Sequence, residues 1–228
     1  MSPLDRPVWS SLATAHRHIS LGDDAARRYL PDVNVFASPG AGGRAASARL
    51  AALVRPGERI FMLQAAPIEP PAGLRLVQAS LGVQMLAQCE AMHVDGPEEI
   101  VRIGEDDAAD MLALAALAKP GPLLRRTHVM GGFVGIRVGG RLVAMAGERM
   151  RFPGFVEISG VCTHPEFRGR GLARRLSLHV AAAIRHRGDR PFLHAWKTNT
   201  PAIRLYQRLG FRHRCDVHVA VLETCDPA

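Results

Sequence analysis

Residues 161–173 read Val-Cys-Thr-His-Pro-Glu-Phe-Arg-Gly-Arg-Gly-Leu-Ala, and this stretch decides the fold. An apolar, strand-like run enters it from Phe155, and apolar residues recur at helical spacing from Gly171 onward. The glycines let the backbone approach a ligand, and the free N–H groups and dipole of a helix start attract negative charge. The stretch therefore predicts a strand–turn–helix unit that holds a pyrophosphate, although a tight turn without a ligand would share the local pattern.

A second pattern, N-x-x-A-x-x-L-Y-x-x-L-G-F, runs from Asn199 to Phe211. The segment Arg168–Ala173 fits the signature R/Q-x-x-G-x-G/A, and His164-Pro165 precedes it. With these motifs the chain resembles the GNAT superfamily of acyl-CoA-dependent N-acyltransferases, and within it the FR47-like branch. That branch includes the C-terminal half of glycine N-acyltransferase-like proteins. The resemblance covers roughly residues 98–222.

Periodicity and turn signals predict the elements of this second part. They are a strand at 100–103, a helix from Asp106 to about Ala118, hairpin strands at 133–138 and 141–145, a strand at 155–163, a helix at 171–188, a strand at 191–195, a helix at 200–210 and a strand at 211–222. The order β-α-β-β-β-α-β-α-β is that of the GNAT core. The resemblance thus implies an α/β (α+β) fold, with a mixed central sheet in which a splayed strand pair binds acyl-CoA.

The first 97 residues form a smaller α/β region to which the sequence assigns no role. We expect a helical turn at 23–29, a loop at 38–43, a helix at 44–54, and strands at 60–63, 74–77 and 83–86. The composition shifts at Gly96-Pro97-Glu98-Glu99. The predicted division is therefore an N-terminal region of residues 1–97 and a GNAT domain of residues 98–228.

The resemblance implies acetyl-CoA as the cosubstrate. Backbone amides of residues 169–174 would face its pyrophosphate, with added charge from nearby arginines, and backbone groups of Val161 and Thr163 would pair with the pantetheine arm. Asn199 would contact the same arm, but it could equally cap the helix that follows it. The predicted cofactor-binding residues are Val161, Cys162, Thr163, Arg168, Gly169, Arg170, Gly171, Leu172, Ala173, Arg174 and Asn199.

Acyl transfer to an amine needs a base for the ammonium proton and an acid for the departing thiolate. By resemblance Tyr206 is the acid, with an ordinary helix-face tyrosine as the alternative. Glu157 is the preferred base, because a carboxylate in an apolar strand is costly to bury unless it has a function or a partner. The alternative is that it is a structural partner for an arginine. Glu148, His194 or a water chain are the other candidates.

Strand alternation bears on the same residues. A period of two would place Glu157, Ser159, Val161 and Thr163 on one face of the strand. It would turn the Cys162 side chain away from Glu157, into packing against a helix.

Composition narrows the class of protein. The 228 residues carry a net charge of +8, but lysine occurs only at Lys119 and Lys197, and the arginines are spread along the chain. This skew is typical of bacterial coding bias and does not favour nucleic-acid binding. The four cysteines lack metal-ligand spacing, and no apolar run reaches the length of a membrane span. The N-terminus shows no short basic segment followed by an apolar stretch, so no secretory signal is expected.

We therefore expect a cytoplasmic, metal-free N-acetyltransferase that acts on a small amine or an amino acid. The alternatives are a protein N-acetyltransferase, a non-catalytic acyl-CoA sensor and a nucleic-acid-binding protein. A homodimer is compatible with the sequence.

Overall fold

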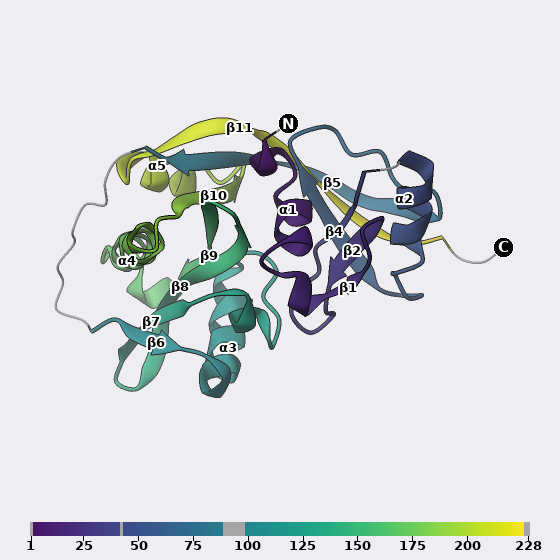
Figure 1. Cartoon of the computed structure of the whole chain (residues 1–228). Coiled ribbons are helices and arrows are strands. Elements are labelled where there is room, and N and C mark those ends of the chain that lie inside the picture. Colours follow the sequence, from purple (N-terminus) through teal and green to yellow (C-terminus); the bar gives the residue numbers. More distant parts are fainter. Residues whose placement is uncertain (1, 42, 89–98, 226–228) are drawn as a thin grey trace.

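The computed structural model describes residues 2–41, 43–88 and 99–225. Within these residues, eight strands form one mixed sheet in the order β4-β11-β5-β10-β9-β8-β7-β6, and β1, β2 and β3 form a small separate sheet (Figure 1). The strands are β1 (Ser20–Gly22), β2 (Ala26–Tyr29), β3 (Ala37–Pro39), β4 (Arg59–Gln64), β5 (Leu74–Ala87), β6 (Val101–Ile103), β7 (Phe133–Val138), β8 (Arg141–Phe152), β9 (Phe155–Thr163), β10 (Arg190–Trp196) and β11 (Phe211–Thr224). The helices are α1 (Pro7–Ala13), α2 (Gly43–Ala51), α3 (Ala108–Ala118), α4 (Leu172–His186) and α5 (Thr200–Arg208).

The predicted order of the second part is confirmed as β6-α3-β7-β8-β9-α4-β10-α5-β11. Local signals account for it. Gly139 and Gly140, both with positive φ, make the two-residue turn between β7 and β8. Gly188 and Gly210, also at positive φ, follow the ends of α4 and α5.

The β9–β10 pair is splayed, as predicted. The two strands pair in parallel from Phe155↔Arg190 to Ile158↔Leu193 and then separate. Beyond this point β9 continues beside β8 as far as Thr163, and β10 continues beside β5 as far as Trp196. The diverging ends leave backbone edges between them that no strand of the sheet covers.

A bulge interrupts β9 at the start of the splay. Its register with β8 shifts between Gly147↔Ser159 and Met145↔Cys162, and Gly160 has φ +65°. The prediction that Glu157, Ser159, Val161 and Thr163 share a face is therefore wrong: Val161 packs in the same hydrophobic cluster as Ile158. A residue three positions further would lie on the opposite face of a regular strand.

Two strands of the first 88 residues, β4 and β5, belong to the large sheet. Strand β5 lies between β10 and β11, and β4 forms the edge beside β11. A single sheet therefore spans the boundary predicted between residues 97 and 98, and residues 89–98 lie outside the described part. The two strands predicted at 74–77 and 83–86 are one strand, which pairs with β11 along its whole length.

Residues 26–29 are a strand and not the helical turn expected at 23–29. The side chains of Arg27 and Arg28 are buried, and Arg28 pairs with Glu58 at 2.6 Å. This partner is thirty residues away, so the local charge pattern could not reveal that these arginines point inward.

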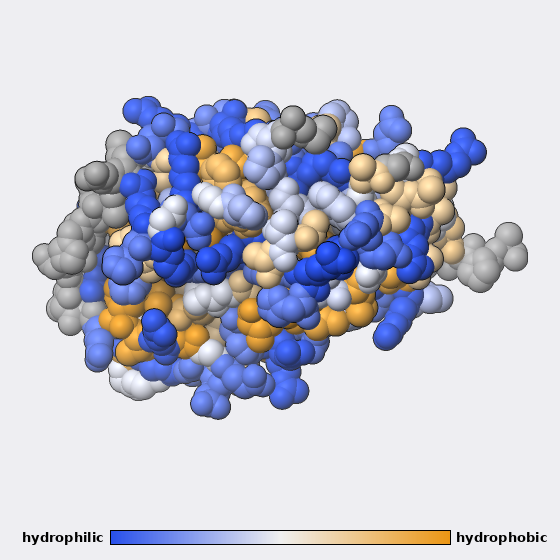
Figure 2. Space-filling view, in the orientation of Figure 1, coloured by the Kyte–Doolittle hydropathy of each residue, from blue (hydrophilic) through white to orange (hydrophobic). Residues whose placement is uncertain are grey.

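The helices cover both faces of the large sheet. Helices α4 and α3 both contact β8 and β9, but they contribute to different hydrophobic clusters and so lie on opposite faces. Hydrophilic side chains are spread over the surface in Figure 2, with smaller apolar groups between them. No helix in the described part of the chain is long and apolar enough to cross a membrane.

Candidate active site

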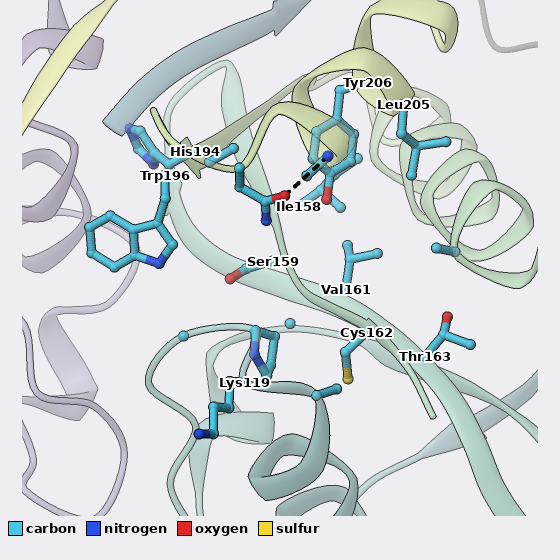
Figure 3. A pocket seen from close by; sticks show the side chains of 18 of the residues that line it. Lys119, Ile158, Ser159, Val161, Cys162, Thr163, His194, Trp196, Leu205 and Tyr206 are labelled. Carbon is cyan, nitrogen blue, oxygen red and sulfur yellow. Dashed lines mark hydrogen bonds between the residues drawn. The ribbon is translucent and has the colours of Figure 1, made fainter. Parts of the chain in front are cut away.

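A cavity of about 670 Å³ opens between the splayed ends of β9 and β10. We call it the central cavity. Figure 3 shows labelled residues of β9 from Ile158 to Thr163 along its wall, with Tyr206 and Leu205 on one side of the strand and Lys119 on the other. The cavity is lined by Phe36, Phe61 and Leu63 of the N-terminal region, residues 118–122 at the end of α3 and after it, Arg149, residues 158–163 of β9, residues 167–169 and 171–174 of the glycine-rich turn and α4, His194–Trp196 of β10, Asn199, Pro201, Ala202, Leu205 and Tyr206 at α5, and Gly82, Val217 and Val219.

The glycine-rich turn forms one end of the central cavity. Gly169 and Gly171 have φ of +79° and +77°, values that glycine adopts without strain. The first intrahelical bond of α4 runs from Arg175 N–H to Gly171 O at 3.0 Å. The amides of residues 172–174 therefore precede the helix ladder and lie at the cavity wall. This is the geometry expected of an anion site.

Most of the predicted cofactor residues line the central cavity, but Arg170 does not. Its guanidinium stacks on Phe167, with Cζ 4.7 Å from the ring centroid. Arg168 and Arg174 do line the cavity. Arg168 thus contributes positive charge to the cavity wall as predicted, and Arg174 contributes it in place of Arg170.

Asn199 lines the cavity and also caps α5, because its Oδ1 accepts a bond from Ala202 N–H at 3.2 Å. Thr163 has a buried hydroxyl with no hydrogen-bond partner in the described residues. A buried hydroxyl without a partner is unfavourable. A ligand amide along this edge of β9 would satisfy it.

Tyr206 reaches the central cavity from α5, and Figure 3 shows its hydroxyl pointing inward. Burial raises the pKa of this phenol well above its ordinary value, so the group keeps its proton at neutral pH. Cys162 lies nearby and packs with Met111 and Leu114 of α3, as predicted for a core residue. Burial raises the pKa of its thiol to about 12, which makes it a poor nucleophile.

Glu157 is fully buried and does not line the central cavity. Arg149 donates to it twice, from Nε at 2.9 Å and from Nη2 at 2.6 Å. Burial alone would raise the pKa of this carboxyl, but Arg149 and His194 outweigh it and lower the pKa to about 2. Glu157 is therefore a buried anion that binds an arginine, the alternative named from the sequence.

His194 lies between Glu157 and the central cavity. Its Nδ1 is 2.7 Å from Glu157 Oε1, and its Nε2 is 3.0 Å from Gln84 Nε2. Gln84 Oε1 accepts a bond from Arg214, so the nitrogen of its amide faces the histidine. The proton of neutral His194 is thus on Nδ1, and Nε2 is an acceptor.

Glu148, the second candidate base, lies outside the central cavity. Arg187, at the end of α4, binds its carboxylate at 2.6 Å. Sequence reasoning also missed residues that line the cavity, among them Arg149, Ser159, Trp196 and the aromatic rings of Phe36 and Phe61. No local signal marks Arg149, because it lies between Glu148 and Arg151, beyond the strand predicted at 141–145.

Comparison with known proteins decides the family. The family model described as FR47-like protein matches residues 133–220. A crystal structure of a putative GNAT-family acetyltransferase from Novosphingobium aromaticivorans is 41% identical, with a TM-score of 0.92 over 99% of this chain and 100% of that one. The chain belongs to the GNAT family. It is a GNAT acetyltransferase, and the predicted FR47-like membership is confirmed.

More distant GNAT relatives share the fold. A GCN5-related N-acetyltransferase from Kribbella flavida is 17% identical, with a TM-score of 0.61 over 95% of each chain. A mycothiol acetyltransferase from Thermobispora bispora is 46% identical over 56 residues, which are 24% of this chain and 19% of that protein. So short a match carries no conclusion about the acceptor of this GNAT enzyme. Within its described residues, no group of three or more histidine, cysteine, aspartate or glutamate side chains could hold a metal ion.

Proposed function

We propose that this enzyme transfers an acetyl group from acetyl-CoA to the amine of a small molecule or amino acid by direct attack. The observation that carries the proposal is the central cavity itself. It joins the glycine-rich turn at one end to Tyr206 and His194 at the splay. An anion site and two groups able to move protons thus share one space.

The residues present fit CoA. The amides of residues 172–174 together with Arg168 and Arg174 would hold the pyrophosphate. The free edge of β9 at Val161 and Thr163, including the unpartnered Thr163 hydroxyl, would pair with the pantetheine arm. Bound in this way, acetyl-CoA supplies an activated thioester carbonyl near the start of the splay.

The transfer forms a C–N bond and breaks the C–S bond of the thioester. The amine must lose a proton, and we assign its uptake to His194 Nε2, which is the unprotonated nitrogen of the ring. Gln84 donates to the same lone pair, so His194 takes up a proton only when that amide turns aside. Glu157 stabilises the resulting imidazolium through Nδ1 and is a positioning residue. Tyr206 donates its proton to the departing thiolate.

The N-terminal region favours a small acceptor over a protein. Phe36, Phe61 and Leu63 form part of the cavity wall on the side of Arg149, so the acceptor space is bounded there by this chain. Ligand pockets often form where two parts of a chain meet. We include in the proposal a bacterial, cytoplasmic setting, which the arginine-rich composition and the use of acetyl-CoA support.

Thiol release from acetyl-CoA in the presence of an amine panel tests the proposal. We expect release that depends on both acetyl-CoA and an amine, with the acetylated amine detected by mass spectrometry. Tight acetyl-CoA binding without turnover of any amine would indicate the non-catalytic sensor. Acetylation of a protein but of no small amine would indicate a protein N-acetyltransferase.

A further inference from the structure

The end of the central cavity away from the glycine-rich turn is built around Arg149. This arginine pairs with Glu157, which lies six residues before Thr163 in β9, or about 20 Å along a strand. Arg149 is thus well separated from the phosphate end. Its side chain is only 10% exposed, yet it lines the cavity.

Arg149 is held rigidly and keeps one donor nitrogen free. Glu157 binds Nε and Nη2, and the guanidinium Cζ lies 4.9 Å from the ring centroid of Phe36. Nη1 has no hydrogen-bond partner in residues 2–41, 43–88 and 99–225. A guanidinium only donates hydrogen bonds, so whatever occupies this end must present an acceptor to it.

Charge at the wall narrows the choice of acceptor group. In the described part of the chain no aspartate or glutamate lines the cavity, whereas Lys119 and Arg149 do. Glu157 lies behind Arg149 and is fully buried, so it does not face the occupant. Lys119 has no ion-pair partner among the described residues. A guanidinium N–H without an acceptor, in a cavity wall that carries cations and no carboxylate, favours a carboxylate as the bound group.

Apart from His194, which binds the same Glu157 oxygen as Arg149, the wall at this end has apolar side chains. Phe36, Phe61, Leu63 and Val217 come from the N-terminal region and β11. Resting on the proposed acetyl transfer, we propose that the acceptor is an amine that also carries a carboxylate and an apolar body, and that Arg149 binds the carboxylate. A hydrophobic amino acid meets this description, with its amine directed toward the splay of β9 and β10.

Matched acceptors test this in the wild-type enzyme. L-phenylalanine and L-leucine are compared with their decarboxylated forms, phenethylamine and 3-methylbutylamine, with phenylalanine amide, and with glycine. We expect kcat/KM for the two amino acids to exceed that for the decarboxylated amines and the amide by about 10- to 100-fold, the effect of a hydrogen bond to a charged group. Glycine should also be poorer, because it lacks the apolar body. Equal or faster turnover of the decarboxylated amines would overturn the inference while leaving the acetyltransferase proposal intact.

Binding without chemistry gives a second measurement. 3-Phenylpropionate has the carboxylate and the ring but no amine, and 3-phenylpropanamide is its neutral counterpart. By calorimetry on the enzyme–CoA complex, the acid should bind at least tenfold more tightly than the amide. Equal affinity, or no binding of either, would overturn the inference even if amine turnover is never seen.

The Arg149→Lys variant keeps the charge but removes the planar fork. It should lower the kcat/KM ratio of phenylalanine to phenethylamine by at least tenfold and leave acetyl-CoA affinity unchanged. Arg102→Gln, at an exposed arginine of β6 outside the cavity, is the control and should keep the wild-type ratio. A folded Arg149→Lys protein with an unchanged ratio would contradict the role of Arg149. If that variant does not fold, the acceptor panel and the calorimetric comparison on the wild-type enzyme still test whether the acceptor carries a carboxylate.

Discussion

His194 Nδ1 lies 2.7 Å from Glu157 Oε1, and of these two residues only His194 reaches the central cavity. The carboxylate is fixed from its other side by Arg149. From the sequence, Glu157 was the preferred base and His194 was named only as an alternative. We propose that His194 acts on the amine, and that the buried carboxylate of Glu157 binds its Nδ1–H and so fixes the orientation of the ring.

The first prediction concerns proton uptake. His194→Asn should lower kcat/KM by about 100-fold or more near pH 7, because general base catalysis contributes that much, and the loss should shrink as rising pH frees the amine. Glu157→Gln should lose less, since Gln can still accept a bond from Nδ1. The profiles are measured from pH 6 to 9, with His179→Asn on the exposed face of α4 as the control. If Glu157→Gln in a folded protein loses as much as His194→Asn at every pH, Glu157 itself is the base.

Stability should depend on pH through Glu157. Its folded-state pKa of about 2 lies below the ordinary value of 4.5, so its contribution is fully present above about pH 4.5 and is lost as the pH falls toward 2. Glu157→Gln should therefore be much less stable than wild type at pH 6, where Arg149 loses its buried partner, and the gap should narrow at pH 3. Urea unfolding of both proteins at several pH values measures this difference in the free energy of unfolding. Glu166→Gln, at an exposed carboxylate, should show only a small gap throughout; a pH-independent gap for Glu157→Gln would contradict the ion pair.

Tyr206→Phe should lower kcat by about 10- to 1000-fold, because the proton for the leaving thiolate is removed. Its hydroxyl has no hydrogen-bond partner in the described residues, so the change leaves no group unpaired, and acetyl-CoA affinity should be retained. The other tyrosine provides a control outside the cavity: Tyr29→Phe should cost stability, because its hydroxyl donates to Ser11 and lies 3.0 Å from His16 Nδ1, but should keep the wild-type kcat. Wild-type turnover by Tyr206→Phe would leave thiolate protonation to water.

Gly171→Val should abolish acetyl-CoA binding measured by calorimetry. The residue has φ +77°, which is strained for a branched side chain, and the new side chain would stand where phosphates approach the backbone. Gly139→Val is the control: Gly139 also has a positive φ, +58°, and a Cβ added at either glycine would have no atom within 4 Å. Gly139 lies in the β7–β8 turn, away from the glycine-rich turn. It should cost stability while keeping acetyl-CoA affinity. Unchanged affinity in Gly171→Val would remove the glycine-rich turn from the cofactor site.

A fragment of residues 98–228 should not fold by itself. Strand β5 separates β10 from β11 in the sheet, so the fragment would leave unpaired backbone on both strands and an open hydrophobic cluster. Circular dichroism with thermal unfolding should show no cooperative transition. Adding residues 1–97 as a second fragment should restore one. A cooperative transition in the fragment by itself would support the two separable halves expected from the sequence.

Much of the fold was accessible from the sequence because its signals are local. The order of elements from β6 to β11 follows from apolar periodicity, and the turns follow from glycines and prolines that permit few other backbone conformations. The glycine-rich turn could be located because its requirements, flexible backbone and free helix amides, are met within a few residues. Arg170 was predicted to add charge to the cofactor site, but its side chain stacks on Phe167. The direction of a side chain depends on such contacts, which the spacing of residues in the motif does not specify.

The sequence by itself therefore determined the GNAT core, the position of the glycine-rich turn and, through the resemblance, Tyr206 as a candidate that lines the cavity. Only the tertiary structure decided that β5 enters the sheet between β10 and β11, that Glu157 is bound by Arg149, and that His194 stands between Glu157 and the cavity. Each of these is a pairing between different strands of the sheet. Strand pairing and the burial of a charge depend on which distant segments meet, and no local pattern of residues records that.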